Sequence, residues 1–73
     1  MSHRGRVKWF DPKKGYGFIF GPDGHDVFVH YSQIEGEGFR SLEDGETVEY
    51  ELIESDKGYQ ARTVQRLVEQ EAQ

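Results

Sequence analysis

The sequence YGFIFGPDGHDVFVHY, at residues 16–31, decides the fold. Its first third alternates aromatic residues with glycine and isoleucine, and its last third alternates valine with polar and aromatic residues. Because the side chains of a β-strand point alternately to its two faces, each part predicts a strand with one aliphatic and one aromatic face. The GPDG sequence between them is typical of a tight turn, since Pro presets φ and Gly tolerates positive φ. We therefore predict two strands, at residues 16–21 and 26–31, that this turn connects.

Three more runs with strand-like composition flank this pair, at residues 4–11, 46–54 and 59–68. Turn signals separate them, and short strands spaced about 8–12 residues apart are typical of an all-β sandwich or barrel. The last run also fits a helix, because Ala61, Val64 and Leu67 recur at helical spacing; we favour a strand that ends near residue 66. A closed barrel of five strands is expected, since closure removes exposed strand edges.

The chain of 73 residues is long enough for one domain with a small core. It has one Trp, four Tyr and five Phe, but few aliphatic residues. Composition alone favours a core position for these rings, because aromatic residues usually lie inside. Where the rings point is therefore the central question about this chain.

Alternation favours the opposite arrangement, with aliphatic residues inside and aromatic residues outside. A chain of this length cannot cover both faces of such a sheet. Asp26 and His30 share the face of Phe28, and burial of an unpaired polar group would cost about 1–3 kcal/mol. The glycines on either side of Tyr16 also leave space around its ring. The residues expected in the barrel interior are Val7, Ile19, Val27, Val29, Val48, Leu52 and Val64.

Two aromatic positions of the first strand stay open at this point. Strict alternation puts Trp9 on the face of the interior residue Val7, so either the strand bulges near Trp9 or one of the two assignments is wrong. Phe10 is either part of a surface cluster or a plug of the barrel. Tyr50 is a candidate for the interior, because it shares the face of Val48.

Composition excludes several classes of function. The chain has no cysteine, which removes disulfides, thiolate nucleophiles, zinc ribbons and iron–sulfur sites. Its histidines lack the spacing of metal ligands and no nucleophile–base pair is apparent, so we expect no metal, no cofactor and no enzymatic activity. No apolar run approaches the ~18 residues of a membrane span, and no hydrophobic region of a secretory signal follows residues 1–6. We expect a cytoplasmic protein.

The net charge of −5 hides an uneven distribution. Residues 3–18 hold five basic residues against one acidic residue, whereas residues 35–56 hold nine acidic residues against one basic residue. The acidic run is expected to be a solvated face. Lys8 adjoins Trp9 in the sequence, and Lys14 precedes Tyr16 by two positions. Rings that stack on bases and cations that meet phosphates are the two parts of a single-strand nucleic-acid site.

Four short sequences together resemble the bacterial cold-shock proteins: GRVKWF at 5–10, KGYGFI at 14–19, DVFVHY at 26–31 and GEGF at 36–39. The second is also similar to the ribonucleoprotein motif K/R-G-F/Y-G/A-F-V, with Ile for Val. The resemblance runs from about residue 5 to about residue 64. It implies an all-β, five-stranded antiparallel OB-fold barrel that binds single-stranded RNA and DNA, as an RNA chaperone or a transcription antiterminator.

The resemblance also implies roles for individual residues. By motif position, the residues that would stack on bases are Trp9, Tyr16, Phe18, Phe28, His30, Tyr31 and Phe39. Lys8 and Lys14 would contact the backbone or base edges, and Asp26 would accept a hydrogen bond from a base. The resemblance places Trp9 on the binding face, which favours the bulge. It also places Tyr31 there, against the strict alternation of its strand.

Simpler roles exist for two of these residues, and the chain departs from the family in one segment. Phe39 would otherwise anchor a loop under the barrel, and His30 would otherwise be a solvated strand residue. The family often has Gly-Pro-Gln-Ala where this chain has GYQA at residues 58–61, so Tyr59 adds another ring. The second rank of candidate contacts consists of Phe10, Phe20, Lys57 and Tyr59.

The expected organisation is one cold-shock domain at residues 1–68 and a flexible tail at residues 69–73. We expect a monomer that does not bind a membrane. The main rival function is a protein-interaction barrel whose aromatic groove holds a Pro-rich or basic peptide. Lysines rather than acids lie among the aromatic residues, which favours nucleic acid over such a peptide.

Overall fold

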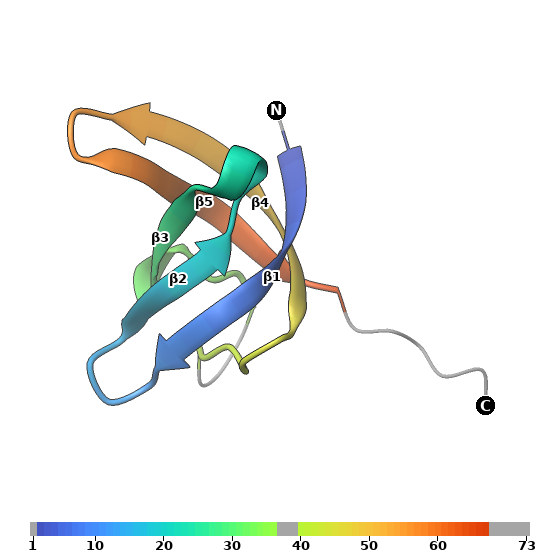
Figure 1. Ribbon diagram of the computed structural model, residues 1–73. Helices are drawn as coiled ribbons and strands as arrows, with labels where there is room; N and C mark the ends of the chain where they lie inside the picture. The colour runs from blue at the N-terminus through green and yellow to red at the C-terminus, as the bar shows by residue number, and fades with distance from the viewer. Residues whose placement is uncertain (1, 37–39, 68–73) are drawn as a thin grey trace.

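The computed structural model describes residues 2–36 and 40–67, which form a small barrel of five strands (Figure 1). The strands are β1 (Ser2–Asp11), β2 (Tyr16–Phe20), β3 (Asp26–His30), β4 (Thr47–Ser55) and β5 (Gly58–Arg66). Two single 3-10 turns, η1 (Pro22–Gly24) and η2 (Tyr31–Gln33), follow β2 and β3. The predicted all-β, five-stranded barrel is confirmed, and the last segment is a strand rather than a helix. In the described ranges, no helix has the length and apolar character needed to cross a membrane.

The barrel closes in the order β1-β2-β3-β5-β4, and one of its seams differs from the prediction. β1 pairs antiparallel with both β2 and β4, and the pairs β2–β3 and β4–β5 are antiparallel hairpins. β3 and β5, however, run parallel, with Val27 opposite Tyr59 and Phe28 opposite Gln60. The antiparallel arrangement expected for the barrel thus holds at four of its five seams and not at the β3–β5 seam. Parallel neighbours need a long crossover, which the chain between β3 and β5 supplies.

The interior is mainly aliphatic, as the alternation predicts, with the rings of Phe10 and Tyr50 added. The described residues that are buried there are Val7, Phe10, Ile19, Val27, Val29, Ile34, Leu42, Val48, Tyr50, Ala61 and Val64. Leu52, expected inside, is only partly buried and packs against this core. Ile34 and Leu42 come from the connection between β3 and β4, which the strand pattern did not address. Both side chains belong to the core, and Ile34 forms an isolated bridge with Val64 of β5.

β5 contains a bulge with an unusual backbone conformation. The β4–β5 register slips between the pairs Glu49–Gln65 and Glu51–Arg62, so β5 has one extra residue there. Thr63 lies in this stretch with a positive φ of 54°. A β-branched residue rarely adopts the left-handed region, and such a conformation costs on the order of 1–3 kcal/mol. The bulge thus stores strain on the side of the barrel away from β2.

Candidate nucleic-acid interface

Four aromatic rings form a continuous surface on the outside of β1, β2 and β3. We call this surface the aromatic face; its members are Trp9, Tyr16, Phe18 and Phe28. The ring centroids lie 5.4 Å apart for Trp9–Phe18, 6.1 Å for Trp9–Tyr16, 5.7 Å for Tyr16–Phe28 and 5.7 Å for Phe18–Phe28. These separations are those of mutually supporting aromatic pairs. The rings therefore hold one another in place while their outer surfaces stay open to solvent.

The pairing of β2 with β3 explains why these rings gather on one side. Phe18 lies opposite Phe28, and the next pair along the ladder is Ile19 opposite Val27. Ile19 and Val27 have no exposed surface, whereas both phenylalanines are partly exposed. Burial of the aliphatic face thus forces the aromatic face outward, and the predicted orientation of both strands is confirmed.

A bulge in β1 adds Trp9 to the aromatic face. Val7 pairs with Ile19 and Trp9 pairs with Phe18, so the register shifts by one residue at Lys8. Two successive side chains, those of Lys8 and Trp9, therefore point outward, and Trp9 is 38% exposed. Of the alternatives left open by the sequence, the bulge is the correct one.

The same bulge turns Phe10 inward. Its side chain is only 7% exposed and belongs to the core, and its backbone N–H donates to Asp44 Oδ1 at 3.3 Å. Phe10 is thus a plug of the barrel, and its placement among the candidate nucleic-acid contacts is wrong. The physical reason is that Lys8 and Trp9 both point outward, which shifts the in-and-out alternation of the strand by one residue. Phe10, outward under strict alternation, therefore points inward.

Tyr31 and His30 extend the ring surface beyond the end of β3. β3 ends at His30, and Tyr31 begins the turn η2, so the strand alternation no longer applies to it. Tyr31 is 47% exposed, and its ring centroid lies 4.6 Å from that of His30. The His30 ring is oriented by Ser32, because its Nδ1 accepts the Ser32 N–H at 3.3 Å and lies 2.9 Å from the hydroxyl. His30 is therefore held in place rather than merely solvated.

Gly15 and Gly17 do not make room for the ring of Tyr16 between them, as the sequence suggested, but for the Tyr31 ring and for the backbone of β1. At Gly15, which has a φ of +82°, an added Cβ would lie 2.6 Å from the Tyr31 ring. At Gly17, an added Cβ would collide with the backbone of Trp9 and lie 2.7 Å from Phe10 Cα. The two glycines thus let Tyr31 fold over the β1–β2 turn and let the bulged β1 approach β2.

The lysines lie at the edges of the ring surface. Lys8 Nζ forms an ion pair with Asp26 Oδ2 at 3.0 Å and sits 5.6 Å from the centre of the Phe20 ring, which is 55% exposed. Exposed ion pairs contribute about 0–1 kcal/mol, so Lys8 can exchange this partner for another anion at little cost.

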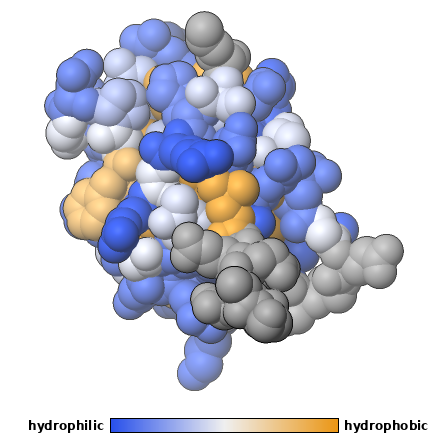
Figure 2. Space-filling view, turned by 90° about the vertical axis from the view of Figure 1, so that its right-hand side faces the viewer, coloured by the Kyte–Doolittle hydropathy of each residue, from blue (hydrophilic) through white to orange (hydrophobic). Residues whose placement is uncertain are grey.

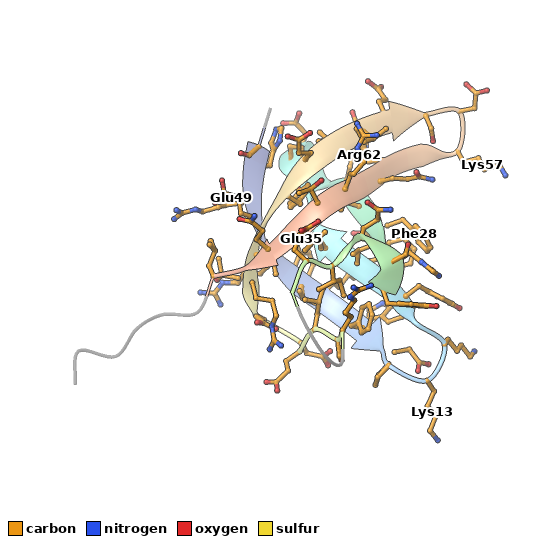
Figure 3. The ribbon with its side chains drawn as sticks, turned by 180° about the vertical axis from the view of Figure 1, so that it is seen from behind. Lys13, Phe28, Glu35, Glu49, Lys57 and Arg62 are labelled. Carbon is orange, nitrogen blue, oxygen red and sulfur yellow. The ribbon has the colours of Figure 1, made fainter. Side chains whose placement is uncertain are left out.

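The β1–β2 turn holds the second group of lysines. Asp11 Oδ1 accepts the backbone N–H groups of Lys13 at 2.9 Å and Lys14 at 3.2 Å, which fixes the turn and exposes both side chains. Figure 3 shows Phe28 on the same side of the barrel as Lys13 in this turn and Lys57 at the tip of the β4–β5 hairpin. Cations thus flank the rings at both ends.

A hollow of about 320 Å³ adjoins the aromatic face at the β3–β5 seam. Phe18, Asp26 and Phe28 line one side of it, and the β4–β5 hairpin lines the other with Lys57, Tyr59 and Gln60. Gln60 was not among the predicted contacts, and only the parallel pairing of β3 with β5 brings it here. The ring of Tyr59 rests on His25, with centroids 5.0 Å apart and planes at 77°. Phe39, the remaining predicted contact, lies outside the described residues.

The opposite side of the barrel has a different chemistry. Figure 2, turned toward the side of β1 and β4, shows a mostly hydrophilic surface with small apolar areas. Glu46 there pairs with Arg66, and this hydrogen bond raises the pKa of the Arg66 guanidinium. The Tyr50 ring points inward, and burial raises the pKa of its hydroxyl.

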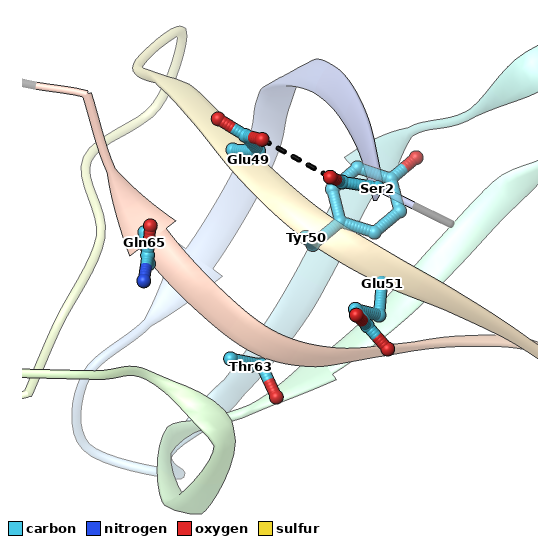
Figure 4. Close-up of a pocket in the computed structure, with 6 residues that line it drawn as sticks. All are labelled: Ser2, Glu49, Tyr50, Glu51, Thr63 and Gln65. Carbon is cyan, nitrogen blue, oxygen red and sulfur yellow. Dashed lines mark hydrogen bonds between the residues drawn. The ribbon is translucent and has the colours of Figure 1, made fainter.

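A second, smaller hollow of about 130 Å³ lies on this opposite side (Figure 4). Glu49 and Glu51 flank it, and Ser2 donates its hydroxyl proton to Glu49 Oε2 at 3.1 Å. The one aromatic residue that lines this hollow, Tyr50, is only 1% exposed, so its ring offers no surface on which a base could stack. Its two carboxylates would repel a phosphate backbone, so this hollow does not belong to the interface.

The fold and the ring surface define a small five-stranded β-barrel with an open aromatic binding surface flanked by lysines. Residues 3–67 match the model of the 'Cold-shock' DNA-binding domain. The chain belongs to the cold-shock domain family, which is a family of nucleic-acid-binding proteins.

Similar proteins agree with this assignment. The chain is 61% identical over 61 residues to the cold shock-like protein of Thermotoga maritima, covering 84% of this chain and 92% of that protein. It is 53% identical over 64 residues to the cold shock protein CspB of Geobacillus stearothermophilus, covering 88% of this chain and 97% of that one. The solved structure of Drosophila Unr CSD456 superposes on the whole chain with a TM-score of 0.73 at 18% identity, over 29% of its own length. The last likeness supports the fold alone.

Proposed function

We propose that this protein binds single-stranded RNA and DNA by stacking unpaired bases on the aromatic face, and that it acts as an RNA chaperone. The observation that carries the proposal is the set of four mutually supported rings, open to solvent on one side of the barrel. Each stacked base contributes about 1–3 kcal/mol, and every base has a π-face, so the binding would tolerate many sequences.

The proposed contacts divide into stacking and polar groups. His30 and Tyr31, whose rings lie together at the end of β3, would continue the stack beyond Phe28. Lys8 and Lys14 would meet the phosphates. The proposed stacking set also keeps Phe39, and its polar set keeps Asp26, which would accept a hydrogen bond from a base edge. Phe20, beside Lys8, is a further candidate.

Such binding needs no catalysis, metal or cofactor. A protein that binds unpaired bases stabilises the open form of an RNA hairpin and leaves the paired form alone, so it shifts the equilibrium by mass action. The same effect on a terminator hairpin would give transcription antitermination. We propose that one copy of residues 1–68 suffices as the binding unit, that residues 69–73 form a flexible tail, and that the protein works in the cytoplasm.

The decisive experiment is a binding screen by Trp and Tyr fluorescence. Single-stranded oligothymidine and oligouridine are compared with duplex DNA and RNA of the same length, and with a Pro-rich basic peptide. We expect binding to both single strands and at least tenfold weaker binding to the duplexes and the peptide. Preference for the peptide would favour the rival protein-interaction barrel, and preference for duplexes would contradict the stacking mechanism.

A further inference from the structure

The turn at residues 43–46, which leads into β4 and which we call the acidic turn, contacts β1 beyond the end of the β1–β4 ladder. That ladder ends at Arg6 of β1. At the next residue of β1, Val7 donates its N–H to Glu46 O at 2.8 Å and accepts the Gly45 N–H at 2.7 Å. The acidic turn therefore lies directly beside the bulge that follows Val7. The sequence suggested only a solvated face for this acidic segment.

Hydrogen bonds within the acidic turn fix its shape. Glu46 donates its N–H to Glu43 O at 3.0 Å, and Glu46 Oε1 accepts the Glu43 N–H at 2.9 Å. Gly45 has a φ of +82°, the positive value that the third residue of a type II turn requires. The ion pair between Glu46 and Arg66 of β5 holds the turn from another side. A turn that is fixed in this way presents its remaining side chain at a defined place on β1.

Asp44 is the side chain that the acidic turn presents to the bulge. Its Oδ1 accepts the backbone N–H of Phe10 at 3.3 Å, although 34 positions separate the two residues in the sequence. The Phe10 side chain is only 7% exposed, and the hydrogen bond is partly buried. A bulge interrupts the regular ladder, and a buried donor left without an acceptor is costly. Asp44 thus supplies an acceptor that the bulged strand needs.

We propose that Asp44 is a positioning residue for the aromatic face: it holds the bulge of β1, and through the bulge the outward position of Trp9. Trp9 and Phe10 are consecutive, so a hydrogen bond that fixes the backbone of Phe10 also fixes the direction of the Trp9 side chain. The Trp9 ring in turn supports Tyr16 and Phe18, at centroid distances of 6.1 and 5.4 Å. The proposal rests on the proposed function, in which Trp9 stacks on a base. Asp44 acts without contact to the nucleic acid.

Three variants of the full chain test this role: Asp44→Ala, Asp44→Asn and, as a control, Glu43→Ala. Asp44→Ala removes the acceptor, whereas Asp44→Asn keeps a side-chain oxygen that can accept from Phe10. Both variants remove the same charge, so the difference between them reports the hydrogen bond alone. Glu43→Ala removes a neighbouring carboxylate, and Glu43 contributes only backbone groups to the hydrogen bonds of the turn.

The first readout needs no ligand, because Trp9 is the only tryptophan in the chain. Its single indole N–H resonance and its emission maximum report the surroundings of the ring. We expect Asp44→Asn and Glu43→Ala to match the wild type, and Asp44→Ala to show a shifted and broadened indole resonance. An Asp44→Ala protein with the wild-type resonance would overturn the proposal.

The second readout is oligothymidine affinity, measured by calorimetry at a temperature at which every variant is folded. We expect Asp44→Ala to bind about threefold to tenfold more weakly, because one stacking ring has lost part of its preorganisation, and the other two variants to stay within about twofold of the wild type. Asp44→Ala is also made in a Trp9→Leu background, where it should cause no further loss, because such a cycle isolates the coupling of two residues. An equal loss in both backgrounds would show that Asp44 does not act through Trp9.

A third measurement covers an Asp44→Ala protein that does not fold. In the wild type, the Phe10 amide should exchange its hydrogen as slowly as the amides of the barrel core. Exchange as fast as at the exposed tip of the β4–β5 hairpin would overturn the proposal without any variant. If the wild type binds no oligothymidine but the indole resonances behave as expected, the proposed function fails and the support of the bulge by Asp44 stands. The two failures are therefore distinguishable.

Discussion

The aromatic residues of β2 and β3 point out of the barrel, whereas the aromatic residue of β4 points into it. On β2 and β3 the rings point outward, and the exposed aromatic side chains Trp9, Phe20 and Tyr31 on this side retain 38%, 55% and 47% of their surface. On β4 the one ring, Tyr50, is 1% exposed, and carboxylates lie between the buried positions. Figure 3 shows the result, with Phe28 and Glu49 on opposite sides of the barrel.

The difference teaches that the residues with which an aromatic residue alternates along its strand, and not the aromatic residue itself, decide whether its ring is buried or exposed. Where aliphatic residues alternate with rings, the aliphatic residues fill the barrel and the rings form a surface. Where glutamates alternate with a ring, the ring is buried, because a carboxylate left without water and partners costs far more. One side therefore carries the proposed site for a polyanion, and the carboxylates of the other side would repel it.

The largest expected effect comes from truncating the buried ring. Tyr50→Ala should destabilise the fold by about 3–5 kcal/mol, because a large side chain leaves a cavity in a core of few residues. Denaturant unfolding followed by circular dichroism measures the change. A decrease in the free energy of unfolding of less than about 1 kcal/mol would contradict the interpretation that Tyr50 is a core residue, in contrast to the outward rings.

Truncating an outward ring should instead affect binding. Phe28→Ala should weaken oligothymidine binding by about 1–3 kcal/mol, as for the loss of one stacked base. Its free energy of unfolding, measured in parallel, should fall by less than that of Tyr50→Ala. Unchanged affinity in a folded variant would refute stacking on the aromatic face.

A smaller effect is expected at the strained bulge of β5. Thr63→Gly should raise the free energy of unfolding by about 1 kcal/mol, since relief of about 1–3 kcal/mol of strain is offset by the greater chain entropy of glycine, about 0.5–1 kcal/mol. Oligothymidine affinity should stay the same, because Thr63 lies away from the aromatic face. A less stable variant would show that the threonine side chain contributes more than its backbone costs.

The smallest effect concerns charge. The wild type should show a shallow dependence of affinity on salt, and Lys14→Gln should lower the slope of log K against log salt by about 0.7. Glu51→Gln, an exposed change of equal size on β4, should leave the slope unchanged. A wild-type slope that implies ten phosphate contacts would contradict a binding mode carried by stacking.

Much of the fold could be predicted because it depends on local periodicity. Ile19, Val27 and Val29 were assigned to the interior from alternation alone, and all three are fully buried. Phe10 could not be placed in this way, since its direction depends on a bulge that exists only when β1 pairs with β2. Tyr31 likewise follows the turn η2 rather than the parity of its strand.

The sequence by itself determined the number of strands, their faces and the separation of basic from acidic segments, because period-2 alternation and turn residues act over a few neighbours. Only the tertiary structure decided which strands meet across the barrel. The parallel seam between β3 and β5 places Tyr59 beside His25 and Gln60 beside Phe28, although more than thirty residues separate the partners in each pair. No local pattern encodes that contact, since it arises from the closure of the whole barrel.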